Sequence, residues 1–323
     1  MRLPKPFYRL PVRFDAARLA AEVEALPPEA WQEHPNRIPG NSSVRLVSVG
    51  GGENDDVNGP MQPTPHLARM PYVRQVLSSF GVVWSRSRLM RLAPGAEVPE
   101  HSDINHHWFY RVRVHIPVIT RPEVAFWCER ERVHMAAGEA WIFDAWRQHR
   151  VENGSGVARV HLVADTTGSA TFWQFVAGSE APGTQVVHVP FDPQRPTPLL
   201  FEQATPPRVM PPAEVDLLLL DLAAELAAQP GLADGELRLA RYLGLLDAFR
   251  RDWRQYYLLH GDAVPELAGY AQVRDALRAS SREFGEGIIV NLEGGGEDAR
   301  AQINFGSAGM KWLALAVAKL EAA

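Results

Sequence analysis

A short polar sequence, His101-Ser102-Asp103, most constrains what this chain can fold into. In an extended strand, residues two apart point to the same side, so His101 and Asp103 can reach one metal ion while Ser102 faces away. His149 follows later in the chain, and Arg159 comes ten residues after it. Two histidines and one carboxylate on one face of a metal ion are typical of non-haem Fe(II) oxygenases. The spacing therefore predicts an iron site and, in Arg159, a basic anchor for a dicarboxylate cosubstrate.

The sequence around these residues is rich in short predicted strands. Alternating apolar residues and Gly or Pro turns indicate strands over 82–92, 111–119, 123–128, 133–135, 140–144 and 157–165. Basic residues alternate along the first of these strands, and residues 105–109 are expected to form a loop. Many short strands without interleaved helices favour a jelly roll.

Two stretches resemble the aspartyl/asparaginyl β-hydroxylase family, in particular its bacterial L-proline cis-4-hydroxylase type: PEHSDINHHWFYRVRVHIPVIT and HMAAGEAWIFDAWRQHRVENGSGVARVHLVADT. The resemblance covers roughly Arg88 to Thr167 and implies a double-stranded β-helix, or jelly-roll, core. It implies an oxygenase that uses Fe(II), 2-oxoglutarate and O2. It also implies that His101, Asp103 and His149 are the metal ligands and that the distal carboxylate of 2-oxoglutarate pairs with an arginine, Arg159.

Two of the predicted strands repeat one phrase, since Arg113-Val114-His115-Ile116 matches Arg159-Val160-His161-Leu162. In each strand, Arg and His share one face and the aliphatic residues share the other, which indicates a polar cavity inside an apolar shell. A solvated outer face is the alternative. The family resemblance implies that Arg113 contacts a substrate carboxylate and that His115 contacts the cosubstrate or substrate. Because Arg113 has no obvious carboxylate partner on its strand face, we expect the substrate itself to carry a carboxylate.

Four further residues are weaker candidates. His107 and Trp108 could contact the substrate, although adjacent histidines on a loop are more often solvated and tryptophans are mostly core residues. His161 is either a site residue or a core histidine. Asp144 is expected to be a turn residue, and the alternative is an acceptor for a metal-bound imidazole.

The rest of the chain predicts two domains of an α+β protein. We expect a strand over 8–14, a helix over 16–25 capped by Asp15, a strand over 43–49, a loop over 50–65 and a helix over 72–80. Residues 186–212 contain eight prolines and are predicted to be a linker. Beyond it, helices are expected over 213–229, 236–260, 266–284 and 310–320, with a loop over 285–296. The predicted division is therefore a jelly-roll domain over 1–185, a linker over 186–212 and a helical domain over 213–323.

Composition restricts the partners and the compartment. A net charge of −5 argues against nucleic-acid binding, which needs concentrated Lys and Arg. No apolar run is long enough to predict a membrane span, and the N-terminal residues do not resemble a signal peptide. The single cysteine, Cys128, fits a reducing compartment, so we expect a cytoplasmic protein. The helical domain could cover the barrel mouth, recognise a larger substrate or form a homodimer contact, and the sequence does not choose among these.

The expected function is hydroxylation of an amino acid, either free (proline-like or acidic) or within a peptide, with release of succinate and CO2. A cupin-type isomerase or hydrolase would use the same ligands with Zn or Mn, but it would not need Arg159 at the spacing of an oxoglutarate anchor. A non-catalytic protein that binds metal and 2-oxoglutarate is the other alternative. A halogenase is disfavoured because Asp103 occupies the position that a halide would need.

Overall fold

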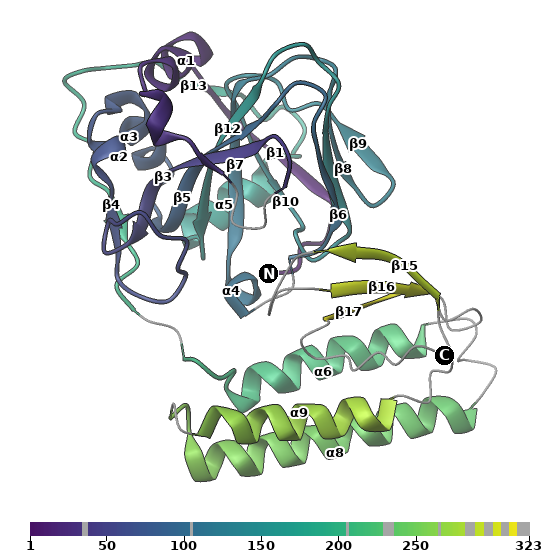
Figure 1. Cartoon of the computed structure of the whole chain (residues 1–323). Coiled ribbons are helices and arrows are strands. Elements are labelled where there is room, and N and C mark those ends of the chain that lie inside the picture. Colours follow the sequence, from purple (N-terminus) through teal and green to yellow (C-terminus); the bar gives the residue numbers. More distant parts are fainter. Residues whose placement is uncertain are drawn as a thin grey trace. The chain divides into compact units, whose positions relative to one another are not determined.

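The computed structural model of the chain describes residues 1–33, 38–103, 106–204, 207–228, 236–263, 266–281, 288–293, 300–304 and 310–314 (Figure 1). The chain divides into two compact units, Met1–Pro206 and Pro207–Ala323. Among the described residues, the helices are too short or too polar to cross a membrane.

The first unit is built on eight strands that pass back and forth between two sheets. The main sheet contains the order β10-β7-β12-β5, and the second sheet has the order β6-β11-β8-β9. In the main sheet the bounds are β5 (Val83–Leu92), β7 (Val112–Ile119), β10 (Glu139–Phe143) and β12 (Arg159–Thr166). In the second sheet they are β6 (Glu97–His101), β8 (Val124–Cys128), β9 (Glu131–Val133) and β11 (His149–Asn153). This interleaved order is that of a jelly roll, so the predicted fold class of the core is confirmed.

Six further strands widen the main sheet on both sides. Next to β10 lie β1 (Phe7–Phe14) and β13 (Val187–Val189), and next to β5 lie β3 (Asn41–Val49), β2 (Gln32–Glu33), β4 (Met61–Pro63) and β14 (Leu200–Phe201). Strands β13 and β14 run parallel to their neighbours β1 and β5. The proline-rich segment 186–212, expected as a linker, thus contains two strands of the main sheet. The division into domains at 185 and 212 remains a proposal.

Helices pack against the outer face of the main sheet (Figure 1). These are α1 (Ala16–Glu24), the 3-10 turn η1 (Pro28–Ala30), α2 (Pro65–Ala68), α3 (Pro71–Ser78) and α5 (Ala170–Gly178). Asp15 caps α1 as predicted, because its Oδ1 accepts a hydrogen bond from the Arg18 N–H at 3.0 Å. The core between helices and sheet contains Leu19, Val73, Leu77, Val114, Ile116, Val160 and Leu162, all at most 2% exposed. Each such side chain contributes roughly 1.5–3 kcal/mol on burial, so this layer fixes which face of β7 and β12 points inward.

The segment after the metal motif differs from its prediction. Residues His106–Tyr110 form a short helix, α4, rather than a loop. Two hydrogen bonds hold it: the Arg111 guanidinium donates to the His107 carbonyl, and the Trp146 indole N–H donates to the Trp108 carbonyl, each at 3.1 Å. Sequence spacing could not show this helix, because both contacts come from outside it.

The second unit contains three helices, α6 (Pro212–Ala227), α8 (Glu236–His260) and α9 (Leu267–Ser281), among its described residues. After them come β15 (Ile288–Glu293), β16 (Arg300–Asn304) and β17 (Met310–Ala314), which form an antiparallel sheet in the order β15-β16-β17. The predictions of a loop over 285–296 and of a helix from Met310 are therefore wrong where β15 and β17 lie, and residues 315–320 are outside the described part. The apolar pattern of residues 310–314 is compatible with a helix or a strand. Pairing with β16, for example of Ala314 with Arg300, makes it a strand.

We predict that a fragment ending at residue 206 is folded and that one ending at residue 185 is much less stable. The shorter fragment loses β13, β14 and Glu202, whose carboxylate accepts a hydrogen bond from the buried Arg111 Nε at 3.1 Å. Removing one partner of a buried ion pair costs roughly 3–5 kcal/mol. Urea unfolding of both fragments, followed by circular dichroism, measures the difference. Equal free energies of unfolding would mean that 186–206 is a linker after all.

Candidate metal centre and its pocket

The structure brings together the three residues predicted to bind metal. Strand β6 ends at His101 and β11 begins at His149, and the two residues are cross-strand partners whose ring centroids lie 4.1 Å apart. Asp103 follows β6, and its N–H donates to the Ala145 carbonyl at 2.8 Å. One ligand atom from each of His101, Asp103 and His149 lies within 4.8 Å of the others. This donor set, two imidazoles and one carboxylate, suits Fe(II).

Backbone contacts orient both imidazoles. Nδ1 of His101 lies 2.7 Å from the Pro99 carbonyl, and Nδ1 of His149 lies 2.9 Å from the Arg147 carbonyl. A carbonyl only accepts hydrogen bonds, so each Nδ1 carries the proton and each Nε2 lone pair is available to a metal ion. Burial and the nearby His101 lower the pKa of His149 to about 3, so its ring is neutral near pH 7, as metal binding requires.

A line of rings leads from the metal ligands into the barrel. The Phe143 ring lies 4.8 Å from that of His149 and 5.2 Å from that of His115, and the His115 and His161 rings are 5.9 Å apart. At the far end, the Arg159 guanidinium lies 2.8 Å from Nδ1 of His161. The repeated Arg-x-His phrases thus face inward from β7 and β12, as the polar-cavity interpretation predicts.

Several buried polar atoms around these rings have no hydrogen-bond partner among the described residues. They are both ring nitrogens of His115, Nε2 of His161 and Nε of Arg159. Burial lowers the pKa of both histidines well below the usual value and lowers the pKa of Arg159 to about 9. Within the described part of the chain, no carboxylate forms an ion pair with Arg159. A buried guanidinium without a counter-charge is costly, so this end of the pocket suits an anion.

Arg113 has a protein partner, which corrects the expectation that it lacks one. Its Nε and one terminal nitrogen donate to the two carboxylate oxygens of Asp165 at 2.7 and 3.1 Å. The register of β7 and β12 places these two residues opposite each other. The inference that the substrate must carry a carboxylate to neutralise an unpaired Arg113 therefore fails, and a substrate contact by Arg113 remains a proposal.

The remaining candidates have defined positions. His107 is buried, with Nε2 at 3.2 Å from the Asp165 carboxylate, and the Trp108 ring lies 4.5 Å from the Arg113 guanidinium carbon. Neither residue is solvated on a loop. Asp144 caps a turn by accepting from the N–H groups of Trp146 and Leu3, as the turn prediction states.

Sequence reasoning missed a group of charged residues on the inner face of the main sheet. Arg86 and Arg88 on β5, Arg45 on β3 and Asp55 in the loop after β3 form ion pairs or hydrogen bonds with one another. The alternation of basic residues along 82–92 could have indicated this group. It was missed because the sequence did not show which face of this strand is buried. Asp55 lies in the predicted loop 50–65.

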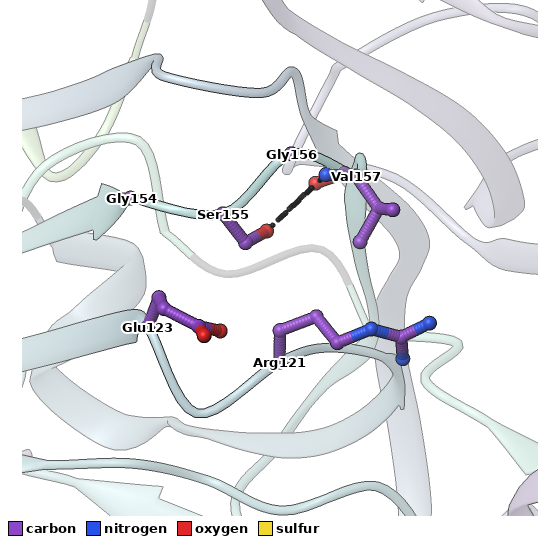
Figure 2. Close-up of a pocket in the computed structure, with 6 residues that line it drawn as sticks. All are labelled: Arg121, Glu123, Gly154, Ser155, Gly156 and Val157. Carbon is purple, nitrogen blue, oxygen red and sulfur yellow. Dashed lines mark hydrogen bonds between the residues drawn. The ribbon is translucent and has the colours of Figure 1, made fainter.

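Figure 2 shows a separate surface pocket of about 290 Å³ between the β7–β8 and β11–β12 connections. Arg121, Glu123 and residues 154–157 line it, and the Ser155 hydroxyl donates to the Val157 carbonyl at 3.0 Å. None of the predicted site residues lines this pocket.

The buried histidines predict how stability depends on pH. Burial lowers the pKa of His107, His115, His149 and His161, so the unfolded chain binds more protons than the native chain below about pH 6.5. Native stability should therefore be present above that pH and fall on acidification, by about 1.4 kcal/mol per pH unit for each histidine. Urea unfolding of the metal-free protein between pH 7.5 and 5 measures this slope. A free energy of unfolding that does not change over this pH range would contradict the conclusion that these histidines are buried and neutral.

Known proteins are similar to the part of the chain that contains His101, Asp103 and His149. Residues 44–168 match the family model of aspartyl/asparaginyl beta-hydroxylase. The chain is 28% identical over 188 residues to L-proline cis-3-hydroxylase 1 from Streptomyces, covering 53% of this chain and 63% of that protein. A 44-residue stretch, 14% of the chain, is 57% identical to DNA helicase II from Salmonella typhimurium and spans 6% of the helicase. The chain thus spans less than two thirds of these curated relatives.

Solved structures with partial similarity include an oxidoreductase of the 2OG-Fe(II) oxygenase family from Burkholderia pseudomallei, 16% identical, covering 48% of this chain and 79% of that one with a TM-score of 0.36. A prolyl-4-hydroxylase from Pseudomonas putida is 14% identical, covering 52% of this chain and 95% of that one with a TM-score of 0.34. The family match covers the metal ligands, both Arg-x-His strands and Asp165. Residues 44–168 are thus similar to the aspartyl/asparaginyl beta-hydroxylase family.

Proposed function

We propose that this protein is an Fe(II)- and 2-oxoglutarate-dependent hydroxylase of an amino acid, either free, proline-like or acidic, or part of a peptide. The observation that carries the proposal is that His101, Asp103 and His149 come together on the same barrel as Arg159, whose buried Nε has no hydrogen-bond partner among the described residues. The family match and the similarity to an L-proline hydroxylase support the same reaction class.

The pocket fits 2-oxoglutarate in charge and in polarity. The 2-oxo acid end would bind at the ligands His101, Asp103 and His149, and the distal carboxylate would pair with Arg159. A planar guanidinium can donate two parallel hydrogen bonds to a carboxylate, which would use its free Nε. When bound, Fe(II), 2-oxoglutarate and O2 supply the oxidation that replaces a C–H hydrogen with a hydroxyl and releases succinate and CO2.

The protein's own residues position the reactants and exclude water. The Phe126 and Phe143 rings contact those of His149 and His115, so the surroundings of these histidines are apolar. A dry wall strengthens the Arg159 ion pair by lowering the local dielectric constant. A second group is the Arg113–Asp165 pair, in which Arg113 Nε donates to Asp165 at 2.7 Å and the Trp108 ring centroid lies 4.5 Å from the guanidinium carbon. We assign this second group to the substrate.

An isomerase or hydrolase that uses the same three ligands would gain nothing from a buried unpaired Arg159. The direct comparison is to incubate the protein with Fe(II), 2-oxoglutarate and O2 and to follow succinate and +16 Da products over a panel of amino acids and peptides. Substrate turnover that does not need 2-oxoglutarate would favour the isomerase or hydrolase. A complete lack of 2-oxoglutarate turnover across the panel would favour a non-catalytic binding protein.

We predict that Arg159→Gln raises the 2-oxoglutarate concentration needed for half-maximal succinate release by at least tenfold. Truncating one partner of a buried, hydrogen-bonded charge pair costs roughly 2–5 kcal/mol. Arg91→Gln is the matched control, because Arg91 lies on β5 with its Nε bonded to the Ser42 hydroxyl at 2.9 Å, away from the pocket. If both variants need the same 2-oxoglutarate concentration as the wild type, the anchor lies elsewhere.

We also predict that His149→Ala abolishes stoichiometric Fe(II) binding and succinate release together, while the native circular dichroism spectrum is retained. His149 supplies one of three ligands and its ring lines a pocket rather than the main core. Anaerobic metal titration measures the occupancy. His134→Ala is the control, because that histidine lies outside the ligand group and bonds the Val124 carbonyl. Full iron occupancy in His149→Ala would refute the ligand assignment.

A further inference from the structure

Helix α6 of the second unit leaves most of its leucines uncovered. It contains six leucines, of which only Leu226 is buried, and Leu217 and Leu220 are 57% and 65% exposed. Single exposed leucines are ordinary on protein surfaces, but a helix that is apolar on most of its sides is usually covered by a partner. The described part of the chain does not provide that cover for α6.

The exposed apolar residues of α6 form a regular stripe. They follow one another at alternating steps of four and three residues: Ala213, Leu217, Leu220, Ala224 and Ala227. This spacing places them on one side of the helix, in the a and d positions of a coiled coil. The stripe is about 21 Å long, at 1.5 Å per residue. It is therefore a seam along which a second helix can pack.

Only acidic side chains flank this stripe. Helix α6 contains four acidic residues and no basic one. Asp221 and Glu225 are exposed along one edge of the stripe. Asp216 lies along the other edge and forms an ion pair with Arg254 of α8 at 2.5 Å. Charges beside such a seam select the partner, so α6 suits a helix that combines apolar residues with basic ones.

Helix α8 has an exposed surface of this kind. Leu243, Arg250, Arg251 and Leu258 are exposed on one side of the helix, and Leu258 is 73% exposed. Asp247 lies among them and forms ion pairs with both Arg250 and Arg251. One carboxylate between two guanidinium groups leaves an excess of positive charge. The exposed surface of α8 is thus complementary to that of α6 in charge, and both carry leucines.

The helices of the second unit bury few apolar side chains among themselves. In the described part of this unit, the buried apolar residues are Val209, Val215, Leu226, Leu246 and Tyr270. Helix α8 contacts both α6 and α9 (Figure 1). A layer of helices is stable when it packs against a further layer, so these helices need one.

We propose that a second copy of this chain supplies this layer, with α6 of each copy packed along α8 of the other in a two-fold symmetric dimer. Symmetry makes the contact twice, and an acidic helix meets a basic one both times. Packing α6 against α6 would instead bring acidic flanks together. The inference does not depend on the proposed function, because it uses no residue of the metal centre.

Sedimentation equilibrium of the full chain, over about a hundredfold range of concentration, measures the dimer. We expect twice the mass of one chain. Leu217→Gln combined with Leu220→Gln should raise the Kd of the dimer at least tenfold, because amides replace the apolar side chains of the seam. Leu200→Gln is the control, since Leu200 is 63% exposed but lies on β14 in the first unit, and this variant should dimerise like the wild type.

A charge exchange tests which helices meet. One variant carries Asp221→Arg with Glu225→Arg, and the other carries Arg250→Glu with Arg251→Glu. Each variant alone should be a monomer, because like charges then face each other at both contacts. An equal mixture of the two should form a dimer, because opposite charges again meet at both contacts.

A wild-type chain that stays a monomer at all concentrations overturns the proposal. If Leu217→Gln with Leu220→Gln then also lowers the free energy of unfolding, the stripe is covered within one chain. A dimer that these leucine changes leave intact overturns the assignment of the interface to α6.

A dimer that Arg250→Glu with Arg251→Glu leaves intact, or an equal mixture that stays monomeric, overturns the contact between α6 and α8. Circular dichroism checks that each variant is folded. If the glutamate variant does not fold, Arg250→Gln with Arg251→Gln takes its place and should weaken the dimer at least threefold. An unchanged Kd in that variant overturns the contact equally.

Discussion

The two-residue alternation of β7 and β12 is the constraint on which the whole site depends. Val114, Ile116, Val160 and Leu162 are each at most 2% exposed and pack against the helices, so the residues between them must point into the barrel. Those residues include Arg113, His115, Arg159, His161 and Asp165. A shift of one residue in register would expose the aliphatic layer and bury the charges against it, so the packing of the outer face enforces the polarity of the inner one.

On the inner face, some polar groups have hydrogen-bond partners within the protein, and others have none among the described residues. At the Asp165 end, carboxylates bond the guanidinium groups and fix their geometry. At the Arg159 end, ring and guanidinium nitrogens are buried without partners. Unsatisfied buried polar groups cost stability, and proteins keep them where a ligand completes the bonding. Under the proposed function, the Arg159 end of β12 would receive the cosubstrate.

Local pattern and motif spacing predicted the parts of the structure that depend on short-range order. The strands of the barrel, the capped helix α1, the meeting of His101, Asp103 and His149, and the inward Arg-x-His faces follow from alternation and spacing in the sequence. The predictions that failed concern features that depend on contacts between distant segments. The Arg113–Asp165 pair depends on the register of two strands, the helix α4 on bonds from Arg111 and Trp146, and β17 on pairing with β16.

Asp55 and Asp165, the two carboxylates that pair with arginines on the inner face, differ in how the fold holds them. Asp165 is on a central strand, fully buried, and burial is outweighed by Arg113 and His107, which hold its pKa well below the usual value. It remains charged and orients Arg113 whether or not a substrate is bound. Asp55 is on a loop, 23% exposed, and is shared between Arg45 and Arg88. Neither carboxylate forms a hydrogen bond with Arg86, whose Nε lies 3.7 Å from an Asp165 oxygen, so Arg86 is held less tightly than Arg113.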